Sequence, residues 1–513
     1  MQKPTIEAMP KDAAAVILLR AGTDRANPEV YWVRRSERMA FLGGFHAFPG
    51  GQRDATDVET RIDNCEEAEA AAMISCAARE LFEEVGVLVA RGSETLTKGQ
   101  RASLLDDLES ERMTFPGLLN HYGLHLDAQD FTYVGRWVTP PFSPRRFDTL
   151  FFLVNCPARQ EPHVTGDAEL ESGEWIEARA AVARWRRSEV LLAPPVLHAL
   201  ETLSGGITDN LIERFLSVAQ AHREPVRRIE FRPGFICFPV RTPTKPPATH
   251  TNCYLVGSSE MVIIDPASPY KDEQEALASC LDDLLAEGRR VREIILTHLH
   301  PDHVAGVHAL NQHFGGSLRV AAHPLTAEAL DGSIHVDRFI EDGEVINLKG
   351  EPHIRLRALH TPGHARGHLC FYEEATGALM TGDNIVGLGS VLIDPPEGNM
   401  RDYLASLERL HALPHLTVLF GAHGPAVGSP RLKIEEYIKH RLEREANILK
   451  AVREGACDAP EIVARVYTDV HPKALPMAER AVLAHLEKLE GDNLIAKRAD
   501  GCYISNDDNP SAS

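Results

Sequence analysis

The sequence predicts a chain of several domains with α/β and α+β architecture. Its 513 residues suffice for about three domains of ordinary size. Apolar residues make up 43% and charged residues 25% of the chain, which is typical of a globular protein and excludes a disordered or fibrous one. Apolar runs of strand length alternate with helical patterns along most of the chain, which favours layered sheets and helices.

Composition also limits the partners and the location of the protein. A formal net charge of −20 disfavours extensive binding of nucleic acid. No run of about 18 apolar residues occurs, so no membrane partner is expected. The start, residues 1–7, lacks the apolar core of a secretory signal, and we therefore expect a cytoplasmic protein. The nine cysteines form no CxxC pair and are expected to be reduced.

The first predicted domain covers residues 8–222. Strands are expected at 13–19 and 30–33, followed by a glycine- and proline-rich loop over 41–51. A long helix is expected over about 66–86. One apolar stripe with a spacing of four residues should be its buried face: Met73, Ala77, Leu81 and Val85.

Three carboxylates lie beside that stripe. Glu80, Glu83 and Glu84 share one flank of the helix, because residues three and four apart lie on the same face. Such a cluster suits Mg²⁺ or Mn²⁺, and Arg79 can pair with Glu83 one turn later. The alternative is an ordinary acidic helix exposed to solvent.

The segments 48–51 and 79–87 together resemble the Nudix hydrolase box. The segments 41–51, 137–140 and 145–152 look like the acyl-CoA diphosphatase branch of that family, which is found in peroxisomes. The resemblance implies a Nudix α/β/α sandwich and metal-assisted cleavage of a pyrophosphate. It implies metal ligands at Glu80, Glu83 and Glu84, of which Glu83 and Glu84 would be catalytic.

The box departs from the standard form in two places. Gly51 stands 28 residues before Arg79, farther than usual, and the early glutamate position falls on Ala71. An insertion over about 54–65 accounts for the longer spacing, and a front domain that binds a nucleotide without cleaving it stays an alternative. Arg145 and Arg146 are candidate substrate-binding residues, since guanidinium groups match phosphate oxygens; pairing with Asp148 is the alternative.

A connector with the first strand of the next domain is expected over 223–250, and the second domain over 251–428. After a predicted strand at 293–296, residues 297–303 bring three histidines and an aspartate together. Neutral imidazole suits zinc, and alternation along an extended loop aims His298 and His300 the same way. Asp302 and His303 would then face a second ion. A histidine-rich surface loop is the alternative.

Further motifs at 360–364, 381–383 and 421–424 complete a resemblance to the metallo-β-lactamase superfamily, in its glyoxalase-II-like and β-lactamase-like endoribonuclease branches. It implies an αββα sandwich with two zinc ions. One zinc would be held by His298, His300 and His364, and the other by Asp302, His303 and His423. Asp383 would bridge them, while His368 is expected to be a hydrogen-bonded packing residue.

Two close metal ions lower the pKa of a shared water, so that hydroxide exists at neutral pH. That hydroxide can attack a carbonyl carbon or a phosphorus, and the metals stabilise the developing oxyanion. Asp302 is expected to orient the nucleophile. Iron and manganese tolerate the same ligands, so the sequence favours zinc without excluding them.

The third predicted domain covers 429–510. A helix with the apolar stripe Ile434, Ile438 and Leu442 is followed by shorter helices and a hairpin around Asp500-Gly501. This order resembles the winged-helix tail of the endoribonuclease branch. Residues 428–513 hold 13 basic and 15 acidic side chains, which disfavours binding to a phosphate backbone, and packing or dimerisation is an equal alternative.

We therefore predict a hydrolase with a binuclear zinc site that cleaves an ester or thioester, fused to a Nudix domain that cuts a nucleoside-diphosphate-linked substrate. Acyl-CoA, or another nucleotide derivative, would be the small-molecule substrate of both. The alternative is an RNA phosphodiesterase at the zinc site, with the Nudix domain as a nucleotide sensor. The sequence does not predict an oligomeric state.

Overall fold

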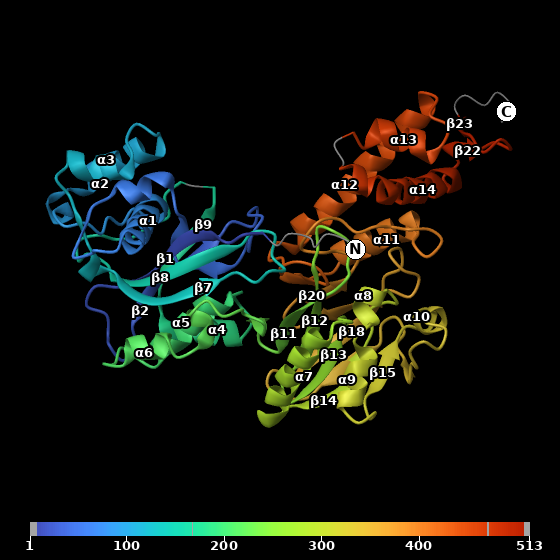
Figure 1. Ribbon diagram of the computed structural model, residues 1–513, viewed down its shortest axis with the longest axis horizontal. Coiled ribbons are helices and arrows are strands. Elements are labelled where there is room, and N and C mark those ends of the chain that lie inside the picture. The colour runs from blue at the N-terminus through green and yellow to red at the C-terminus, as the bar shows by residue number, and fades with distance from the viewer. Residues whose placement is uncertain (1–7, 167, 469–470, 507–513) are drawn as a thin grey trace. The chain divides into compact units, whose positions relative to one another are not determined.

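The computed structural model describes residues 8–166, 168–468 and 471–506. The start at 1–7 and the last residues of the third predicted domain, 507–510, lie outside this range. The chain forms two compact units, Met1–Ile236 and Cys237–Ser513, coloured blue to green and green to red in Figure 1.

A mixed sheet with helices on both faces forms the first unit (Figure 1). Its strand order is β3-β2-β1-β8-β7, with β4 paired to β1 and β9 paired to β2. Every residue of the central strand from Ala13 to Leu19 is buried, as expected where both faces of a sheet are covered. The strands are β1 (Lys11–Leu19), β2 (Glu29–Arg35), β3 (His46–Ala47), β4 (Gly50–Gln52), β7 (Thr132–Val138), β8 (Phe147–Asn155) and β9 (Leu170–Glu177).

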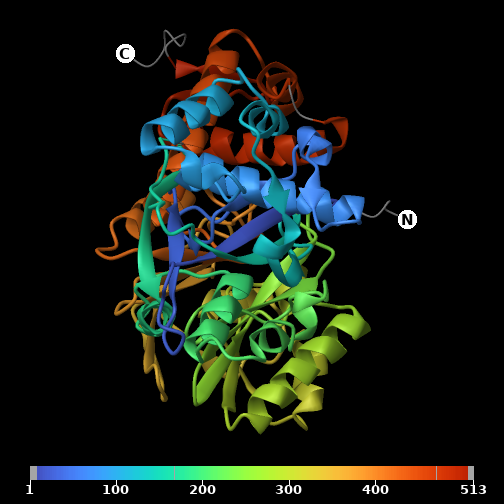
Figure 2. The same cartoon turned by 90° about the vertical axis from the view of Figure 1, so that its left-hand side faces the viewer.

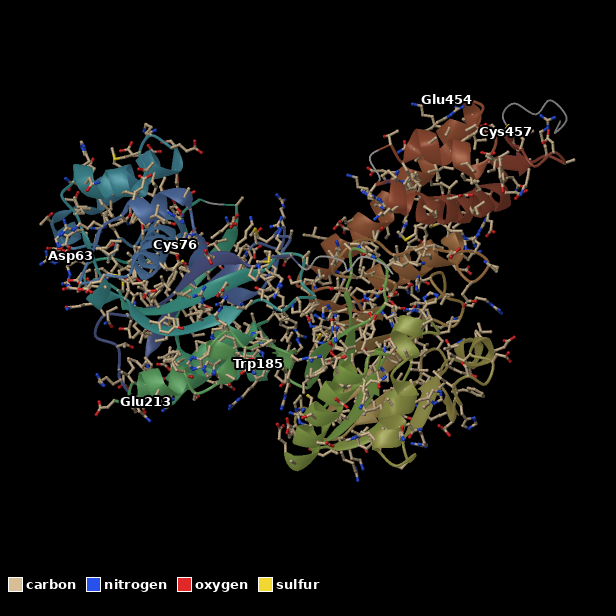
Figure 3. The ribbon with its side chains drawn as sticks, in the orientation of Figure 1. Asp63, Cys76, Trp185, Glu213, Glu454 and Cys457 are labelled. Carbon is tan, nitrogen blue, oxygen red and sulfur yellow. A yellow bond between two sulfur atoms is a disulfide. The ribbon has the colours of Figure 1, made fainter. Side chains whose placement is uncertain are left out.

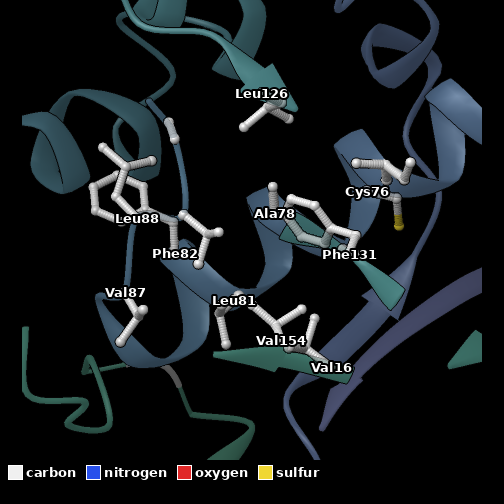
Figure 4. Packing of buried hydrophobic residues seen from close by; sticks show 14 of the residues in the cluster. Val16, Cys76, Ala78, Leu81, Phe82, Val87, Leu88, Leu126, Phe131 and Val154 are labelled. Atoms are coloured by element: carbon white, nitrogen blue, oxygen red, sulfur yellow. The ribbon is translucent and has the colours of Figure 1, made fainter. Parts of the chain in front are cut away.

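Helix α1 (Ala68–Val85) covers one face of this sheet, and its predicted apolar stripe is fully buried. Leu81 and Phe82 pack with Val16 of β1 and Val154 of β8 in one cluster (Figure 4). Gly86 ends the helix with φ +68°, a conformation that glycine adopts without steric penalty. The other helices are α2 (Lys98–Glu109), α3 (Phe115–His121), α4 (Ala178–Arg186), α5 (Pro194–Ser204) and α6 (Leu211–Phe215).

The second unit contains the larger part of a seven-stranded sheet, with α7 (Lys271–Ala286) and α9 (Val307–His313) beside its strands (Figure 1). The strand order follows the chain from β10 to β16, and β13 to β16 run parallel. The strands are β10 (Ile229–Arg232), β11 (Phe235–Arg241), β12 (His250–Gly257), β13 (Glu260–Ile264), β14 (Arg290–Ile295), β15 (Arg319–Ala322) and β16 (Arg338–Phe339).

A five-stranded sheet forms the other inner layer of this unit. It runs in the order β17 to β21, and α11 (Met400–His411) packs on it through Tyr403 and Leu407. The two sheets meet where Tyr254 of β12 donates a 2.7 Å hydrogen bond to the carbonyl of Gly421. The result is the predicted αββα sandwich. Its remaining strands are β17 (Val345–Leu348), β18 (Ile354–His360), β19 (Leu369–Glu373), β20 (Ala378–Gly382) and β21 (Val418–Gly421).

Three helices and a hairpin follow the sandwich, coloured orange to red in Figure 2. They are α12 (Pro430–Arg453), α13 (Ala459–Val466), α14 (Leu475–Gly491) and the antiparallel pair β22 (Ile495–Lys497) and β23 (Tyr503–Ser505). The predicted stripe of α12 is wrong at Leu442, which is 48% exposed. Tyr437 and Arg441 are buried instead, because α12 packs on the five-stranded sheet as well as on its own small core.

The expectation of reduced cysteines is wrong for one pair. Cys457 (Figure 3) and Cys502 form a disulfide that joins the start of α13 to the hairpin. The other seven cysteines are free, and six of them are buried. Among the described residues, no helix has the length and apolar character needed to cross a membrane.

Candidate functional site

All the predicted metal ligands of the second unit lie just after strand ends. The loop after β14 carries His298, His300, Asp302 and His303, and α8 (Pro301–Val304) begins within it. The loop after β18 carries His364, while Asp383 and His423 follow β20 and β21. Both sheets therefore contribute to one site.

The first group contains His298, His300, His364 and Asp383, whose candidate ligand atoms all lie within 4.8 Å of one another. His300 Nδ1 lies 3.0 Å from His298 Nε2 and 2.9 Å from His364 Nε2. His298 is completely buried. Three ring nitrogens thus face one point, as a metal ion requires.

The second group contains Asp302, His303 and His423, again within 4.8 Å. Asp383 lies between the groups and turns one oxygen to each. Its Oδ2 is 3.4 Å from His364 Nε2, while its Oδ1 is 3.4 Å from His303 Nε2 and 3.3 Å from His423 Nε2. The structure therefore brings together all seven residues that the sequence singled out.

In three of the histidines, Nε2 faces the ligand groups and the other ring nitrogen, Nδ1, makes a hydrogen bond. His303 Nδ1 lies 2.8 Å from Asp265 Oδ2, His364 Nδ1 lies 2.9 Å from the carbonyl of Leu392, and His423 Nδ1 lies 2.8 Å from the carbonyl of His250. Such contacts fix the ring and direct Nε2 toward the metal position.

Sequence reasoning missed Asp265. This residue is 2% exposed and also accepts hydrogen bonds from the main-chain N–H and the hydroxyl of Thr297, at 2.8 and 2.6 Å. It holds the first residue of the histidine loop and one ring of the second group. Its position at the end of the apolar run 261–265 was the available hint, since polar groups at strand ends often serve sites.

His368 is hydrogen-bonded, as predicted, but its partner gives it a larger role. Its Nε2 accepts a 3.1 Å hydrogen bond from the main-chain N–H of Asp383, and its Nδ1 lies 3.0 Å from Thr361 Oγ1. His368 therefore supports the residue that joins the two groups.

The electrostatics favour neutral imidazoles in the first group and an ionised Asp383. In the second group burial acts to lower the pKa of His303 and of His423, but nearby carboxylates, above all Asp383, raise both above the ordinary value. Burial, reinforced by His303, His300 and His364, holds the pKa of His298 well below its ordinary value. Burial acts to raise the pKa of Asp383, but His423 and His303 outweigh it and hold that pKa well below the ordinary value. Neutral imidazole and carboxylate are the forms that bind metal.

Two buried atoms test whether a metal fits. His303 Nε2 and Asp383 Oδ1 have no hydrogen-bond partner among the described residues. Buried polar atoms are nearly always satisfied, and a cation between these two would satisfy both. The donor set of imidazoles and carboxylates suits zinc. A cavity of about 690 Å³ opens onto five of the seven residues: His300, Asp302, His364, Asp383 and His423.

The acidic helix of the first unit is a separate candidate site. Gly50 donates a 2.8 Å hydrogen bond to Glu84, and a Cβ on Gly51 would lie 2.5 Å from Glu80 Oε2, so a side chain there would displace the Glu80 carboxylate. Burial raises the pKa of Glu80 to about 7 and that of Glu84 to about 8. The pKa of Glu83 is also raised, chiefly by burial.

Arg79 holds this helix to the predicted insertion. It donates to Glu80 and Glu83 at 2.8 and 2.7 Å, which confirms the predicted pair with Glu83. It also donates at 3.1 and 3.0 Å to Asp57, which is completely buried. The insertion thus supplies the main counter-ion of Arg79, while Ala71 packs against the apolar core.

The two candidate phosphate-binding arginines differ in their surroundings. Arg146 donates to the carbonyls of Thr139 and Ala8, at 2.9 and 3.0 Å, whereas Arg145 is exposed. The alternative of pairing with Asp148 is wrong, because Asp148 pairs with Arg136 and Arg223 at 2.7 and 2.8 Å.

Comparison with known families agrees with this architecture. Residues 59–203 match the NUDT19 Nudix domain, residues 246–423 the metallo-β-lactamase superfamily, and residues 459–502 the β-lactamase associated winged helix domain. The chain is a metallohydrolase of composite type, with the three predicted domains in the predicted order.

Relatives identify the family. An atrochrysone carboxyl ACP thioesterase of Aspergillus chevalieri is 32% identical over 49% of this chain and 79% of its own length. A β-lactamase-like protein 2 homolog of Caenorhabditis elegans is 27% identical over 48% of this chain and 80% of its own. A metallo-β-lactamase family protein of Thermus thermophilus covers 53% of this chain and 99% of its own, with 26% identity and a TM-score of 0.44. The matching family model and the 32% identity to the relative from Aspergillus chevalieri show that the chain belongs to the metallo-β-lactamase superfamily.

Proposed function

We propose that the second unit is a binuclear zinc hydrolase that cleaves the thioester of an acyl-CoA or of another acyl carrier. The observation that carries this proposal is the pair of ligand groups joined by Asp383 beside a cavity of about 690 Å³. The printed name of the relative from Aspergillus chevalieri, an ACP thioesterase, supports the choice of a thioester.

In this proposal one zinc is held by His298, His300 and His364, and the other by Asp302, His303 and His423, with Asp383 shared. Bound zinc supplies a nucleophile at neutral pH and stabilises negative charge on the substrate oxygen. Asp302 borders the cavity and orients the nucleophile.

We further propose that the Nudix domain cleaves the diphosphate of the same class of substrate. Glu80, Glu83 and Glu84 would bind Mg²⁺ or Mn²⁺, with Glu83 and Glu84 as the catalytic groups. Arg145 and Arg146 would contact phosphate, Arg145 from its exposed position. The cytoplasmic location expected from the sequence is part of this proposal.

Mass spectrometry of the products from a medium-chain acyl-CoA tests both domains, with metal-loaded protein and an EDTA control. Free CoA and fatty acid, absent with Asp302→Ala, would support the thioesterase. Adenosine 3′,5′-bisphosphate and acyl-phosphopantetheine, reduced about 10³-fold by Glu83→Gln, would support the Nudix activity. Tight nucleotide binding without product would support the sensor alternative.

Substrate that returns unchanged in every reaction would overturn the CoA assignment. Single-stranded RNA at low salt is the next substrate in that case, because low salt strengthens binding to a phosphate backbone. Cleavage of RNA that is lost in Asp302→Ala would replace the thioesterase with the phosphodiesterase alternative.

A further inference from the structure

The cavity beside the proposed zinc site has a wall that the β-lactamase fold does not provide. The C-terminal helices line it together with the loop 386–392 and the loop between β11 and β12. From the C-terminal domain the argument concerns four lining residues: His440, Arg441, Arg444 and Tyr467. The C-terminal domain is therefore placed to contact whatever enters the cavity.

Arg441 is a buried cation in this wall. It is 4% exposed, and its guanidinium lies 5.3 Å from the centre of the Tyr403 ring. Its Nη2 donates to the carbonyl of Val391, while its Nε has no hydrogen-bond partner among the described residues. No carboxylate of the described residues pairs with it. A buried charge without a counter-ion is costly, so binding of an anionic group beside Arg441 would be favourable.

Two further cations border the same cavity. Arg444, three residues along α12, donates at 2.8 Å to the carbonyl of Val466 and lies 4.1 Å from the Tyr467 ring. Lys245 is exposed on the facing loop. Burial, followed by the charges of Arg441 and Arg444, lowers the pKa of His440 in the same wall, against the opposing charge of Glu443.

The carboxylates of the cavity have other partners. Asp394 pairs with Arg480, and Glu397 accepts a 2.9 Å hydrogen bond from the main-chain N–H of Arg366. Asp302 and Asp383 belong to the metal groups. The positive charge of Arg441 and Arg444 is thus left for a ligand.

We propose that Arg441, Arg444 and Lys245 bind the phosphate of a phosphopantetheine arm while its thioester lies at the metal groups. A guanidinium pair suits the geometry of phosphate oxygens. CoA and acyl carrier protein share this arm, so the subsite recognises the chemistry common to both. The inference rests on the proposed thioesterase function and names the part of the substrate that the C-terminal domain recognises.

Two thioesters that differ only in this phosphate test the subsite: octanoyl-4′-phosphopantetheine and octanoyl-pantetheine. We expect the protein to prefer the first by at least about 10-fold in kcat/KM, mainly through KM. Arg441→Gln and Arg444→Gln should each remove most of the preference. Lys439→Gln is the matched control, since it removes one charge from the exposed side of α12 and should keep the preference.

Arg441 also holds Val391, next to the Leu392 carbonyl that binds His364, so its loss could disturb the metal site. Each variant is therefore judged by the ratio of its kcat/KM values for the two thioesters. Lys245→Gln tests the third cation of the subsite at a position on an exposed loop. Equal losses for both substrates would assign Arg441 a positioning role and overturn the subsite, as would the absence of a preference in the unmodified protein.

Calorimetric titration of the metal-loaded protein with 4′-phosphopantetheine and with pantetheine separates this inference from the proposed function. Tighter binding of the phosphorylated ligand that weakens in Arg441→Gln would support the subsite even if neither thioester were cleaved. Equal binding of the two ligands would overturn it. Octanoyl-CoA and octanoyl-ACP, compared at equal concentration, then distinguish the free from the protein-bound arm.

Discussion

The two candidate metal sites are built in opposite ways. In the second unit, imidazoles from three loops converge because hydrogen bonds to Asp265, the Leu392 carbonyl and the His250 carbonyl aim three of them. In the first unit, three carboxylates come from a single helix, and one guanidinium, that of Arg79, links two of them. The histidine site is fixed by geometry, whereas the acidic site is fixed by charge balance.

The two sites should therefore be sensitive to different kinds of substitution. Substitutions of residues that are distant in the sequence but hold the histidine rings should disrupt the histidine site. Substitutions that change the balance of charges around Arg79 should disrupt the acidic site. The first kind of change should alter metal retention, and the second should alter the stability of the unit.

The largest effect is expected from Asp383→Ala, which removes the residue that serves both ligand groups. Thioester hydrolysis should fall by about 10⁴-fold, because both proposed zinc ions lose a ligand. Inductively coupled plasma mass spectrometry should show the loss of zinc from the purified protein. Glu83→Gln is the control and should retain zinc; a fully loaded Asp383→Ala variant would contradict the shared role.

The next largest effect is expected in the first unit. Asp57→Asn leaves the buried Arg79 without its main counter-ion and should lower the free energy of unfolding of that unit by about 4 kcal/mol. Calorimetric unfolding can follow the transition of that unit. Asp63→Asn, which removes a half-exposed partner of His125, should change stability by less than about 1 kcal/mol. A similar small change in Asp57→Asn would show that charge balance does not hold the site.

Acid should weaken the first unit through His46, a residue outside both sites. Burial, then Arg184 and Arg34, lowers the pKa of His46 to about 4, against the opposing charge of Glu174. The unfolded chain therefore binds a proton at higher pH than the folded chain does. Stability should fall as the pH drops from about 6.5 to about 4, by about 3 kcal/mol at about 1.4 kcal/mol per pH unit.

His46→Phe keeps an aromatic ring beside Trp32, whose centroid lies 4.3 Å away, and removes the titration. Unfolding of the variant by urea should show a weaker dependence on pH over that range. An unchanged pH dependence would mean that other groups cause the acid sensitivity.

The smallest effect is expected from Asp265→Asn. This change keeps the shape of the side chain but weakens its hold on His303 and Thr297, and should reduce zinc affinity by about 10- to 100-fold. Competition with a fluorescent chelator measures the change. Asp282→Asn, at a surface pair with His313, is the matched control. An unchanged affinity in Asp265→Asn would indicate that the loop backbone alone aims the ring.

The candidate ligands can be predicted from the sequence because they cluster in short motifs, and the segment 297–303 alone supplies four of them. The cluster of glutamates on α1 can also be predicted, because residues three and four apart on a helix share one face. Both predictions depend on local order along the chain. The division of the candidate ligands into two groups came from the family resemblance, and the structure brings the same residues together in each group.

Contacts between distant residues could not be predicted. Asp265 reaches His303 across 38 residues, and Cys457 reaches Cys502 across 45, with no pattern that relates either pair. The buried face of α12 was misjudged at Leu442 because a spacing of four residues cannot show that the helix packs on two different cores. The pairing of Asp57 with Arg79 could not be predicted, because Asp57 lies in an insertion that has no counterpart in the standard box.

Two side chains of α12 hold the loop 386–392 in place. Tyr437 shares hydrogen bonds with Val386 and Gly389, and Arg441 holds Val391. The loop then supplies the carbonyl that aims His364. During translation all seven ligand residues leave the ribosome before α12 does. A nascent chain stopped before residue 430 would therefore carry all seven candidate ligands yet lack the support of α12 for the loop that aims His364.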